Sequence, residues 1–125
     1  MLCRLPALLL AAALPACTTV RPVAFSVFFP PLAASLDTRA KGAIADTARL
    51  ANAYPYATVR VAGYSGAQGP IADELRLAGR RADAVERQLV ANGVGPGRIR
   101  REVHAPIAYP NPAQARRVDI VIAGP

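Results

Sequence analysis

The sequence predicts an α/β domain, an α+β sandwich in which two helices pack on one face of a mixed four-stranded sheet. Short apolar runs rich in β-branched and aromatic residues alternate with two longer segments whose apolar residues recur at helical spacing. The resulting order is β-α-β-α-β-β, and helices that alternate with strands in this way pack onto a sheet. The length, 125 residues, suits one small domain.

The first two predicted elements are a buried strand and a helix. Residues 23–29 (VAFSVFF) form the apolar, β-prone run, and Pro30 stops it because proline cannot donate to a strand ladder. The helix begins with Asp37 or Ser35 as its cap and continues to about Ala53. Its apolar face consists of Ala40, Ile44, Ala48 and Ala51, with Leu50 beside them.

Residues 57–64 (ATVRVAGY) partly alternate and predict a second strand, followed by a loop and a second helix. Pro70 suits the first turn of that helix, and Gly93 suits its C-terminal cap. One continuous apolar stripe is predicted along it, made of Ile71, Leu75, Ala78, Ala82, Val85 and Leu89. The remaining elements are a third strand, a proline-rich loop and a fourth strand, at residues 98–103, 105–112 and 118–122.

The N-terminus has the pattern of a secretory signal peptide. Residues 1–16 contain one positive charge, Arg4, then an apolar run that ends in small residues. Residues 14–17 (LPAC) resemble the lipobox of bacterial lipoproteins, which implies that Cys17 becomes the first residue and receives acyl chains, palmitate among them. More than one acyl chain would anchor the protein stably to a membrane. The alternative is an ordinary secretory cleavage that leaves Cys17 free.

Composition narrows the function of the mature chain, residues 17–125. Cleavage removes Cys3, so Cys17 remains alone and no intramolecular disulfide is possible. Loss of Arg4 lowers the formal charge from +7 to about +6, and most of that charge is arginine. A basic surface is typical of nucleic-acid binding, but export makes nucleic acid an unlikely partner. Lipid head groups and peptidoglycan carboxylates are the anions that an exported domain meets.

No catalytic or metal-binding motif occurs in the sequence. His104 is the only histidine, and neither a nucleophile elbow nor a phosphate loop nor a metal-ligand cluster is present. We therefore expect neither an enzyme nor a cofactor. Residues 98–101 (RIRR) form a basic cluster on the third predicted strand, with Arg98 and Arg100 facing one way and Ile99 the other. This cluster is either a solvated sheet face or a contact with anionic lipid or glycan.

Several motifs in order resemble the OmpA-like domain, the peptidoglycan-binding module that also occurs in Pal lipoproteins. Residues 77–85 (LAGRRADAV) are similar to the family pattern L-S-x-x-R-A-x-A-V. Residues 89–94 (LVANGV) and 97–99 (GRI) follow at the family's spacing, and residues 115–120 (ARRVDI) are similar to N-R-R-V-E-I. The resemblance covers residues 23–125, and residues 17–22 then form a lipidated cysteine with a short tether.

The resemblance implies a site for the diaminopimelate residue of the peptidoglycan stem peptide. In the family, an arginine of L-S-x-x-R-A holds the ligand carboxylate, and the aspartate of a G-H-T-D loop accepts from its ammonium. The arginine corresponds to Arg81, whereas the loop reads Gly63, Tyr64, Ser65 and Gly66, so glycine replaces the aspartate. Glu74 replaces a family asparagine and lies two helical turns before Arg81.

Two interpretations of function remain open at the level of sequence. In the first, the protein is a lipoprotein of the outer membrane that faces the periplasm and binds peptidoglycan non-covalently, with Arg81 taking a carboxylate and Glu74 or Asp73 supplying the lost negative charge. In the second, the OmpA-like scaffold has lost diaminopimelate binding and joins a protein complex of the cell envelope. The candidate site residues are Tyr64, Ser65, Gly66, Glu74 and Arg81.

Overall fold

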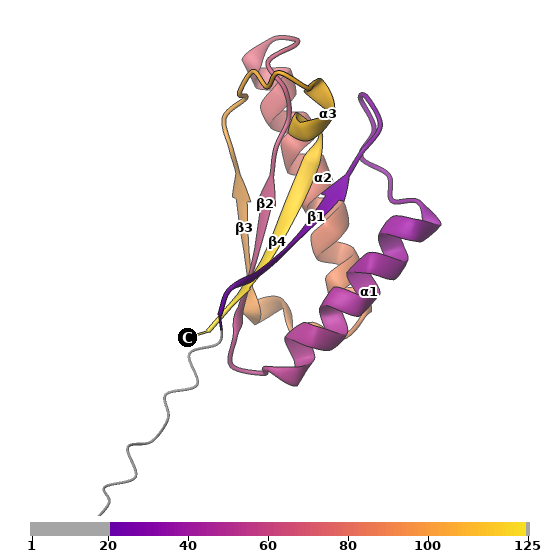
Figure 1. Cartoon of the computed structure of the whole chain (residues 1–125), viewed down its shortest axis with the longest axis vertical. Helices are drawn as coiled ribbons and strands as arrows, with labels where there is room; N and C mark the ends of the chain where they lie inside the picture. Colours follow the sequence, from indigo (N-terminus) through magenta and orange to yellow (C-terminus); the bar gives the residue numbers. More distant parts are fainter. Residues whose placement is uncertain (1–20, 125) are drawn as a thin grey trace, which may run out of the picture.

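The computed structural model describes residues 21–124, so the predicted signal peptide and Cys17 lie outside the described residues. The predicted order of strands and long helices is confirmed, with two short helices added (Figure 1). The strands are β1 (Val23–Phe28), β2 (Thr58–Gly63), β3 (Ile99–Val103) and β4 (Arg117–Ala123). The helices are α1 (Thr38–Ala53), α2 (Ile71–Ala91), the 3₁₀ helix η1 (Pro96–Arg98) and α3 (Pro112–Ala115).

The four strands form one mixed sheet in the order β1-β4-β2-β3. Strand β4 is antiparallel to both of its neighbours, and it pairs Val27 with Val118 on one side and Gly63 with Val118 on the other. Strands β2 and β3 are parallel, as expected when a helix connects them. Strands β1, β2 and β3 therefore run in the same direction, and the segments that follow β1 and β2 meet at one end of the sheet.

Both long helices have identifiable caps. The Asp37 carboxylate accepts a hydrogen bond from the Ala40 N–H at 2.7 Å, which confirms the predicted start of α1. Helix α2 ends in a Schellman motif, in which Gly93 has a positive φ of 94° and the Val94 N–H donates to the Leu89 carbonyl at 3.0 Å. Leu89 and Val94 are both buried, so this cap also ties the end of α2 to the core.

Helices α1 and α2 cover one face of the sheet (Figure 1). The core between them consists of inward residues of the strands, such as Val59, Val61, Val118, Ile120 and Ile122, packed against Ile44, Ala48, Ala82, Val85 and Leu89. No helix covers the other face of the sheet among residues 21–124 (Figure 1). Buried and accessible residues accordingly alternate along β4. No helix among residues 21–124 is both long enough and apolar enough to cross a membrane.

The predicted apolar stripe of α2 is wrong in its first two turns. Ile71 is 69% exposed and Leu75 is 37% exposed, whereas Glu74, Leu77 and Arg81 are buried. The start of α2 extends beyond the sheet, so Ile71 and Leu75 have no sheet to pack against. The buried face of this part of the helix is instead turned toward the loops at the end of the sheet.

The prediction for the region around Arg98 also needs correction. The prediction placed Arg98 and Arg100 on the same face of a strand. Strand β3 begins at Ile99, however, and Arg98 belongs to η1. The Arg98 guanidinium donates to the carbonyls of Ala51 (2.7 Å), Tyr54 (2.8 Å) and Ala57 (3.1 Å). Arg98 therefore satisfies carbonyl groups at the C-terminal end of α1, as cationic side chains at helix C-termini do.

Candidate functional site

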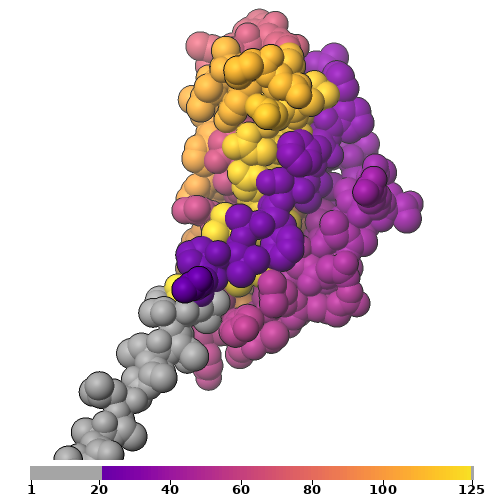
Figure 2. All heavy atoms as spheres, in the orientation of Figure 1, coloured from indigo at the N-terminus to yellow at the C-terminus, as the bar shows by residue number. Residues whose placement is uncertain are grey.

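An open cleft of about 440 Å³ lies at the end of the sheet where the β1–α1 loop, the β2–α2 loop, the start of α2 and α3 meet. In the space-filling view the segment that contains α3 (orange) covers this end of the molecule, beside the β1–α1 segment in violet (Figure 2). Charged residues of both signs line the cleft. Its lining includes Leu32, Gly66, Gly69, Asp73, Glu74, Leu77, Arg81, Pro112 and Arg116.

Arg81 lies at the base of the cleft but is only 1% exposed. Its Nε donates to the Ala33 carbonyl at 2.8 Å, and its terminal nitrogens donate to the carbonyls of Tyr64 (3.4 Å) and Pro30 (3.3 Å). Its guanidinium also stacks over the Phe29 ring at 5.4 Å. Arg81 therefore joins α2 to the loops that follow β1 and β2, and most of its hydrogen-bonding capacity is used within the protein.

The charges around Arg81 differ in sign. Burial lowers the pKa of the Arg81 guanidinium, and the positive charges of Arg116 and Arg80 lower it further, while Glu74 acts in the opposite direction. Two cationic and two acidic side chains, those of Arg81, Arg116, Asp73 and Glu74, thus line the same cleft. A ligand that carries one ammonium and one carboxylate matches this distribution of charge.

Glu74 is the buried acidic residue of the cleft. It lies in the first turn of α2, is 9% exposed, and its carboxylate has no hydrogen-bond or ion-pair partner among residues 21–124. Asp73 beside it is exposed and pairs with Arg76. No unpaired side-chain nitrogen or oxygen atom among residues 21–124 is fully enclosed, so the Glu74 carboxylate reaches the cleft. It is therefore accessible to a cationic ligand.

Arg116 is the second cationic residue of the cleft. It was not among the predicted site residues. Its Nε donates to the Phe29 carbonyl at 3.0 Å, while its two terminal nitrogens make no hydrogen bond to residues 21–124. Half-buried at the end of α3, it lines the cleft together with Glu74. Arg116 belongs to the last motif of the resemblance, residues 115–120, and this motif was the signal that could have identified it.

Gly66 lines the cleft and leaves room there for a Cβ atom. A Cβ atom at this position would lie 3.6 Å from the Ala115 Cβ and 3.7 Å from the Gln68 Cγ, which are ordinary contacts. Its backbone does not have a positive φ, unlike that of Gly93. A side chain at position 66 would therefore fit without strain.

Ser65 and Tyr64 do not present their side chains to the cleft. The Ser65 hydroxyl is buried and donates to the Glu74 carbonyl at 2.7 Å, so it joins the β2–α2 loop to the first turn of α2. The Tyr64 ring lies on the open face of the sheet, where it stacks on His104 with ring centroids 4.5 Å apart. Neither residue is part of the cleft lining.

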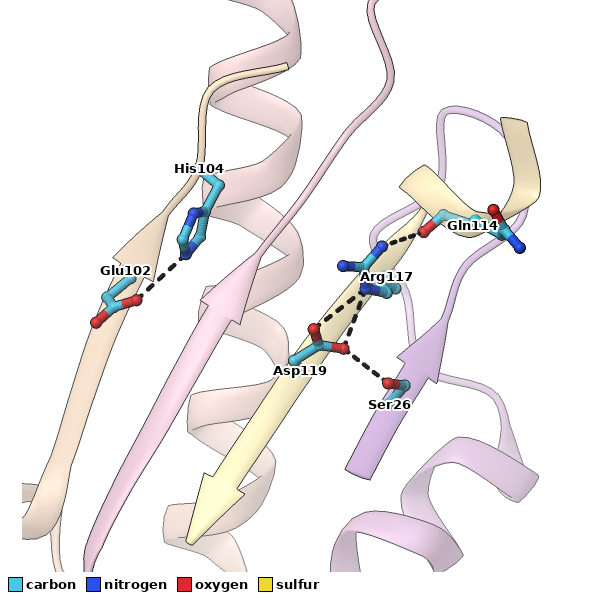
Figure 3. A network of polar contacts seen from close by, with 6 residues as sticks. All are labelled: Ser26, Glu102, His104, Gln114, Arg117 and Asp119. Carbon is cyan, nitrogen blue, oxygen red and sulfur yellow. Dashed lines mark hydrogen bonds and ion pairs between the residues drawn. The ribbon is translucent and has the colours of Figure 1, made fainter. Parts of the chain in front are cut away.

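A network of polar contacts lies on the open face of the sheet (Figure 3). Arg117 Nε donates to both oxygens of Asp119 at 3.2 and 3.1 Å, and its terminal nitrogen donates to the Gln114 carbonyl at 2.7 Å. Its guanidinium stacks on Tyr64 at 4.2 Å and on Tyr109 at 5.4 Å. Burial alone would lower the pKa of Arg117, but hydrogen bonds to Tyr109 and Asp119 raise it.

This network connects the sheet to segments next to the cleft. Arg117 links the sheet to α3 through Gln114 and to the proline-rich loop through Tyr109, and α3 ends beside Arg116. His104 pairs with Glu102 at 3.2 Å on strand β3, at the edge of the same face. Among residues 21–124, no group of three or more His, Cys, Asp and Glu side chains is placed to hold a metal ion.

The fold and the cleft together define a small α+β module with a zwitterionic cleft at the loop end of its sheet. The chain belongs to the OmpA family, whose family model matches residues 28–118. A segment of 46 residues, 37% of this chain, is 48% identical to outer membrane porin F of Pseudomonas fluorescens. The matched segment spans only 14% of that porin, so the similarity concerns a small part of it.

Solved structures with the same fold include the peptidoglycan-associated lipoprotein of Burkholderia pseudomallei, with a TM-score of 0.71 and 24% identity over 78% of this chain and 88% of that one. The OmpA-like domain of FopA1 from Francisella tularensis has a TM-score of 0.72 and 21% identity over 83% and 73% of the two chains. The C-terminal domain of MotB from Helicobacter pylori has a TM-score of 0.70 and 19% identity over 81% and 85%. These similarities confirm the predicted fold.

Proposed function

We propose that this protein is a lipoprotein of the outer membrane, anchored through Cys17, whose periplasmic domain binds the diaminopimelate residue of peptidoglycan non-covalently. Membership of the OmpA family supports the proposal, as does similarity to a peptidoglycan-associated lipoprotein. The observation that carries it is Glu74. The residue as a whole is 9% exposed and lines the cleft, and its carboxylate has no partner among residues 21–124. Its charge and position suit the ammonium group of the ligand.

The cleft assigns a separate role to each charged group. Glu74 accepts from the ligand ammonium in place of the family aspartate, whose position is Gly66. The terminal nitrogens of Arg116 donate to the ligand carboxylate, while Arg81, whose three donor nitrogens already reach backbone carbonyls, holds the surrounding loops in place. Charge-assisted hydrogen bonds of this kind contribute about 1.5–3 kcal/mol each.

The first test is co-sedimentation of residues 18–125 with purified sacculi whose stem peptides contain diaminopimelate. We expect Glu74→Gln and Arg116→Gln each to weaken binding by about tenfold to a hundredfold, because each removes one charge-assisted contact with the ligand. The solution contains moderate salt, so that loose adsorption of arginine is screened. Glu74→Gln keeps the shape of the side chain, whereas Arg116→Gln also removes the hydrogen bond from Arg116 Nε to the Phe29 carbonyl. Thermal unfolding of both variants is therefore measured beside binding.

Matched controls lie on α1. Asp46→Asn and Arg49→Gln make similar changes of charge in an exposed ion pair far from the cleft, and we expect neither to affect sedimentation. Sacculi with lysine in place of diaminopimelate lack the second carboxylate and should be insensitive to Arg116→Gln. If wild-type protein does not sediment, or if the cleft and control variants behave alike, the alternative role as a protein-interaction component of an envelope complex replaces this proposal.

Restoring the family aspartate should strengthen binding. Gly66→Asp places a carboxylate on the cleft wall, and the position has room for a Cβ atom with no strain in the backbone. We expect binding of diaminopimelate sacculi to increase about tenfold, measured in the same assay. Gly66→Asn is the control of equal size, and a tighter association for both variants, or for neither, would contradict a role for charge at this position.

A further inference from the structure

The end of the molecule opposite the cleft gathers the segments through which the chain enters the domain. Because β1, β2 and β3 run in the same direction and β4 runs against them, the first residues of these three strands meet the last residues of β4 (Figure 1). We call this surface the tether end; it comprises residues 21–23, 54–60, 97–100 and 122–124. Strand β1 has six residues, so the tether end and the cleft end are separated by roughly 20 Å or less along this strand.

The tether end is positively charged. Residues 21–28, 50–60 and 92–101 contain five arginines and no aspartate or glutamate. Arg98 satisfies carbonyls of α1, and Arg101 pairs with Asp83 of α2 at 3.2 Å, so these two arginines serve the fold. The other three, Arg21, Arg60 and Arg100, are exposed, and of the Arg100 nitrogens only Nη1 makes hydrogen bonds within residues 21–124, to the carbonyls of Gly97 (2.9 Å) and Ile99 (3.3 Å).

Arg60 and Arg100 lie side by side in the register of β2 and β3, and both line a shallow groove of about 340 Å³ that Pro22 and Glu102 also line. Glu102 is the only acid that pairs with either arginine among residues 21–124, and it is 3.9 Å from Arg60. The groove thus has two arginines and one acidic residue, whereas the cleft has two arginines and two acidic residues, Asp73 and Glu74. The two ends of the domain therefore differ in the ligands that they can attract.

Two tyrosines accompany this charge. Tyr54 and Tyr56 flank Pro55 in the turn between α1 and β2, and they are 45% and 85% exposed. Neither contributes to the core. Tyrosine is enriched at membrane–water interfaces because its ring is apolar and its hydroxyl is hydrated. These segments combine exposed tyrosines with arginines and contain no acidic residue. Such a combination favours contact with anionic lipid head groups.

We propose that the tether end docks on the surface of a bilayer that contains anionic phospholipid. Arg21, Arg60 and Arg100 contact the phosphates, Tyr54 and Tyr56 lie at the level of the head groups, and the cleft faces away from the membrane. The docking surface itself consists only of described residues. The proposed anchor on Cys17 would keep this end near the bilayer, because residues 18–22 span at most about 18 Å when extended.

Binding to vesicles tests this inference without the anchor. All strands and the core lie within residues 23–123, so residues 18–125 retain them while lacking Cys17. We expect this fragment to co-sediment with vesicles of phosphatidylcholine containing about one-third phosphatidylglycerol, and to be released by salt. Vesicles of phosphatidylcholine alone should bind it far less. Replacing Arg21, Arg60 and Arg100 with glutamine should weaken binding about a hundredfold.

The matched control replaces Arg39, Arg49 and Arg87 with glutamine, which removes the same charge from exposed positions on α1 and α2. Equal losses for the two triple variants would overturn the proposal, because attraction by net charge alone would then explain the binding. So would equal binding to the two kinds of vesicle. Thermal unfolding measured by circular dichroism verifies that both variants are folded.

A fluorescence measurement tests the orientation. The protein contains no tryptophan, so a single introduced tryptophan reports on its own surroundings. We expect the emission of Tyr56→Trp to shift to the blue when anionic vesicles are added, and that of Ile71→Trp, an exposed position at the cleft end, to stay unchanged. The opposite pattern, or equal shifts, would overturn the proposed orientation. Vesicles contain no peptidoglycan, so the docking inference and the proposed peptidoglycan binding can fail separately.

Discussion

Arg81→Ala should lower the free energy of unfolding by about 3 kcal/mol or more, because it removes a buried side chain that donates to three backbone carbonyls. Two of the carbonyls, those of Pro30 and Ala33, belong to the β1–α1 loop, and the third, that of Tyr64, lies directly after β2. The midpoint of thermal unfolding should fall by more than about 10 °C in a domain of this size. Circular dichroism during heating measures this directly.

The neighbouring arginine provides the control. Arg80→Ala removes an identical but exposed side chain from the same turn of α2, and we expect a change within about 0.5 kcal/mol. If Arg81→Ala unfolds at the temperature of Arg80→Ala, Arg81 is not the structural link described here. For the same reason, loss of sacculus binding in Arg81→Ala is informative only when the variant is compared with Glu74→Gln, which leaves those three hydrogen bonds in place.

Gly63→Ala should be equally damaging, by about 3 kcal/mol, although it adds a single methyl group. A Cβ atom at Gly63 would lie 2.3 Å from the Ala78 carbonyl oxygen and 3.1 Å from the Ala82 Cβ. The obstacle is helix backbone, which cannot rotate aside, so α2 would have to move away from β2. The loss should appear as a lower midpoint in both urea and thermal unfolding.

Gly42→Ala is the matched control for this prediction. Gly42 lies in α1, and a Cβ atom there would have no neighbour within 4 Å. We expect this substitution to stabilise the protein slightly, by up to about 1 kcal/mol, because alanine favours helix more than glycine does. A tolerated Gly63→Ala would show that β2 and α2 are not in the close contact that the structure describes.

The movement of α2 that Gly63→Ala would cause also has a consequence for the site. Helix α2 provides Glu74 and Arg81 to the cleft, while Gly66 and Arg116 are provided by other elements. A shift of α2 would separate Glu74 from Arg116. The small residues Gly63, Ala78 and Ala82 let β2 and α2 approach closely, and this approach sets where α2 places Glu74 relative to Arg116.

Local patterns in the sequence were sufficient to predict the order of strands and long helices. The apolar run of β1 and the cap residues Asp37 and Gly93 depend on neighbours within a few positions, and the structure confirms them. The motif that contains Arg81 selected it as a candidate binding residue, and Arg81 lines the cleft. Features that depend on neighbouring residues, such as strand runs and helix caps, could therefore be predicted from the sequence.

Other features were decided only by the tertiary structure, because they depend on residues that are distant in the sequence. The helical spacing of Ile71 and Leu75 predicts burial, but the start of α2 extends beyond the sheet, so both are exposed. Arg98 was assigned to a strand because its neighbours are β-prone, yet its guanidinium reaches carbonyls more than 40 residues away in α1.

The site shows the same division. Residue type and motif selected five candidate binding residues. Gly66, Glu74 and Arg81 line the cleft, whereas Tyr64 and Ser65 do not. Whether a side chain is available to a ligand depends on which carbonyls surround it, and no local pattern reports this. Folding brings the carbonyls of Pro30, Ala33 and Tyr64 around Arg81 and leaves the ends of Arg116 and Glu74 unoccupied by residues 21–124, because segments far apart in the sequence meet at that end of the sheet.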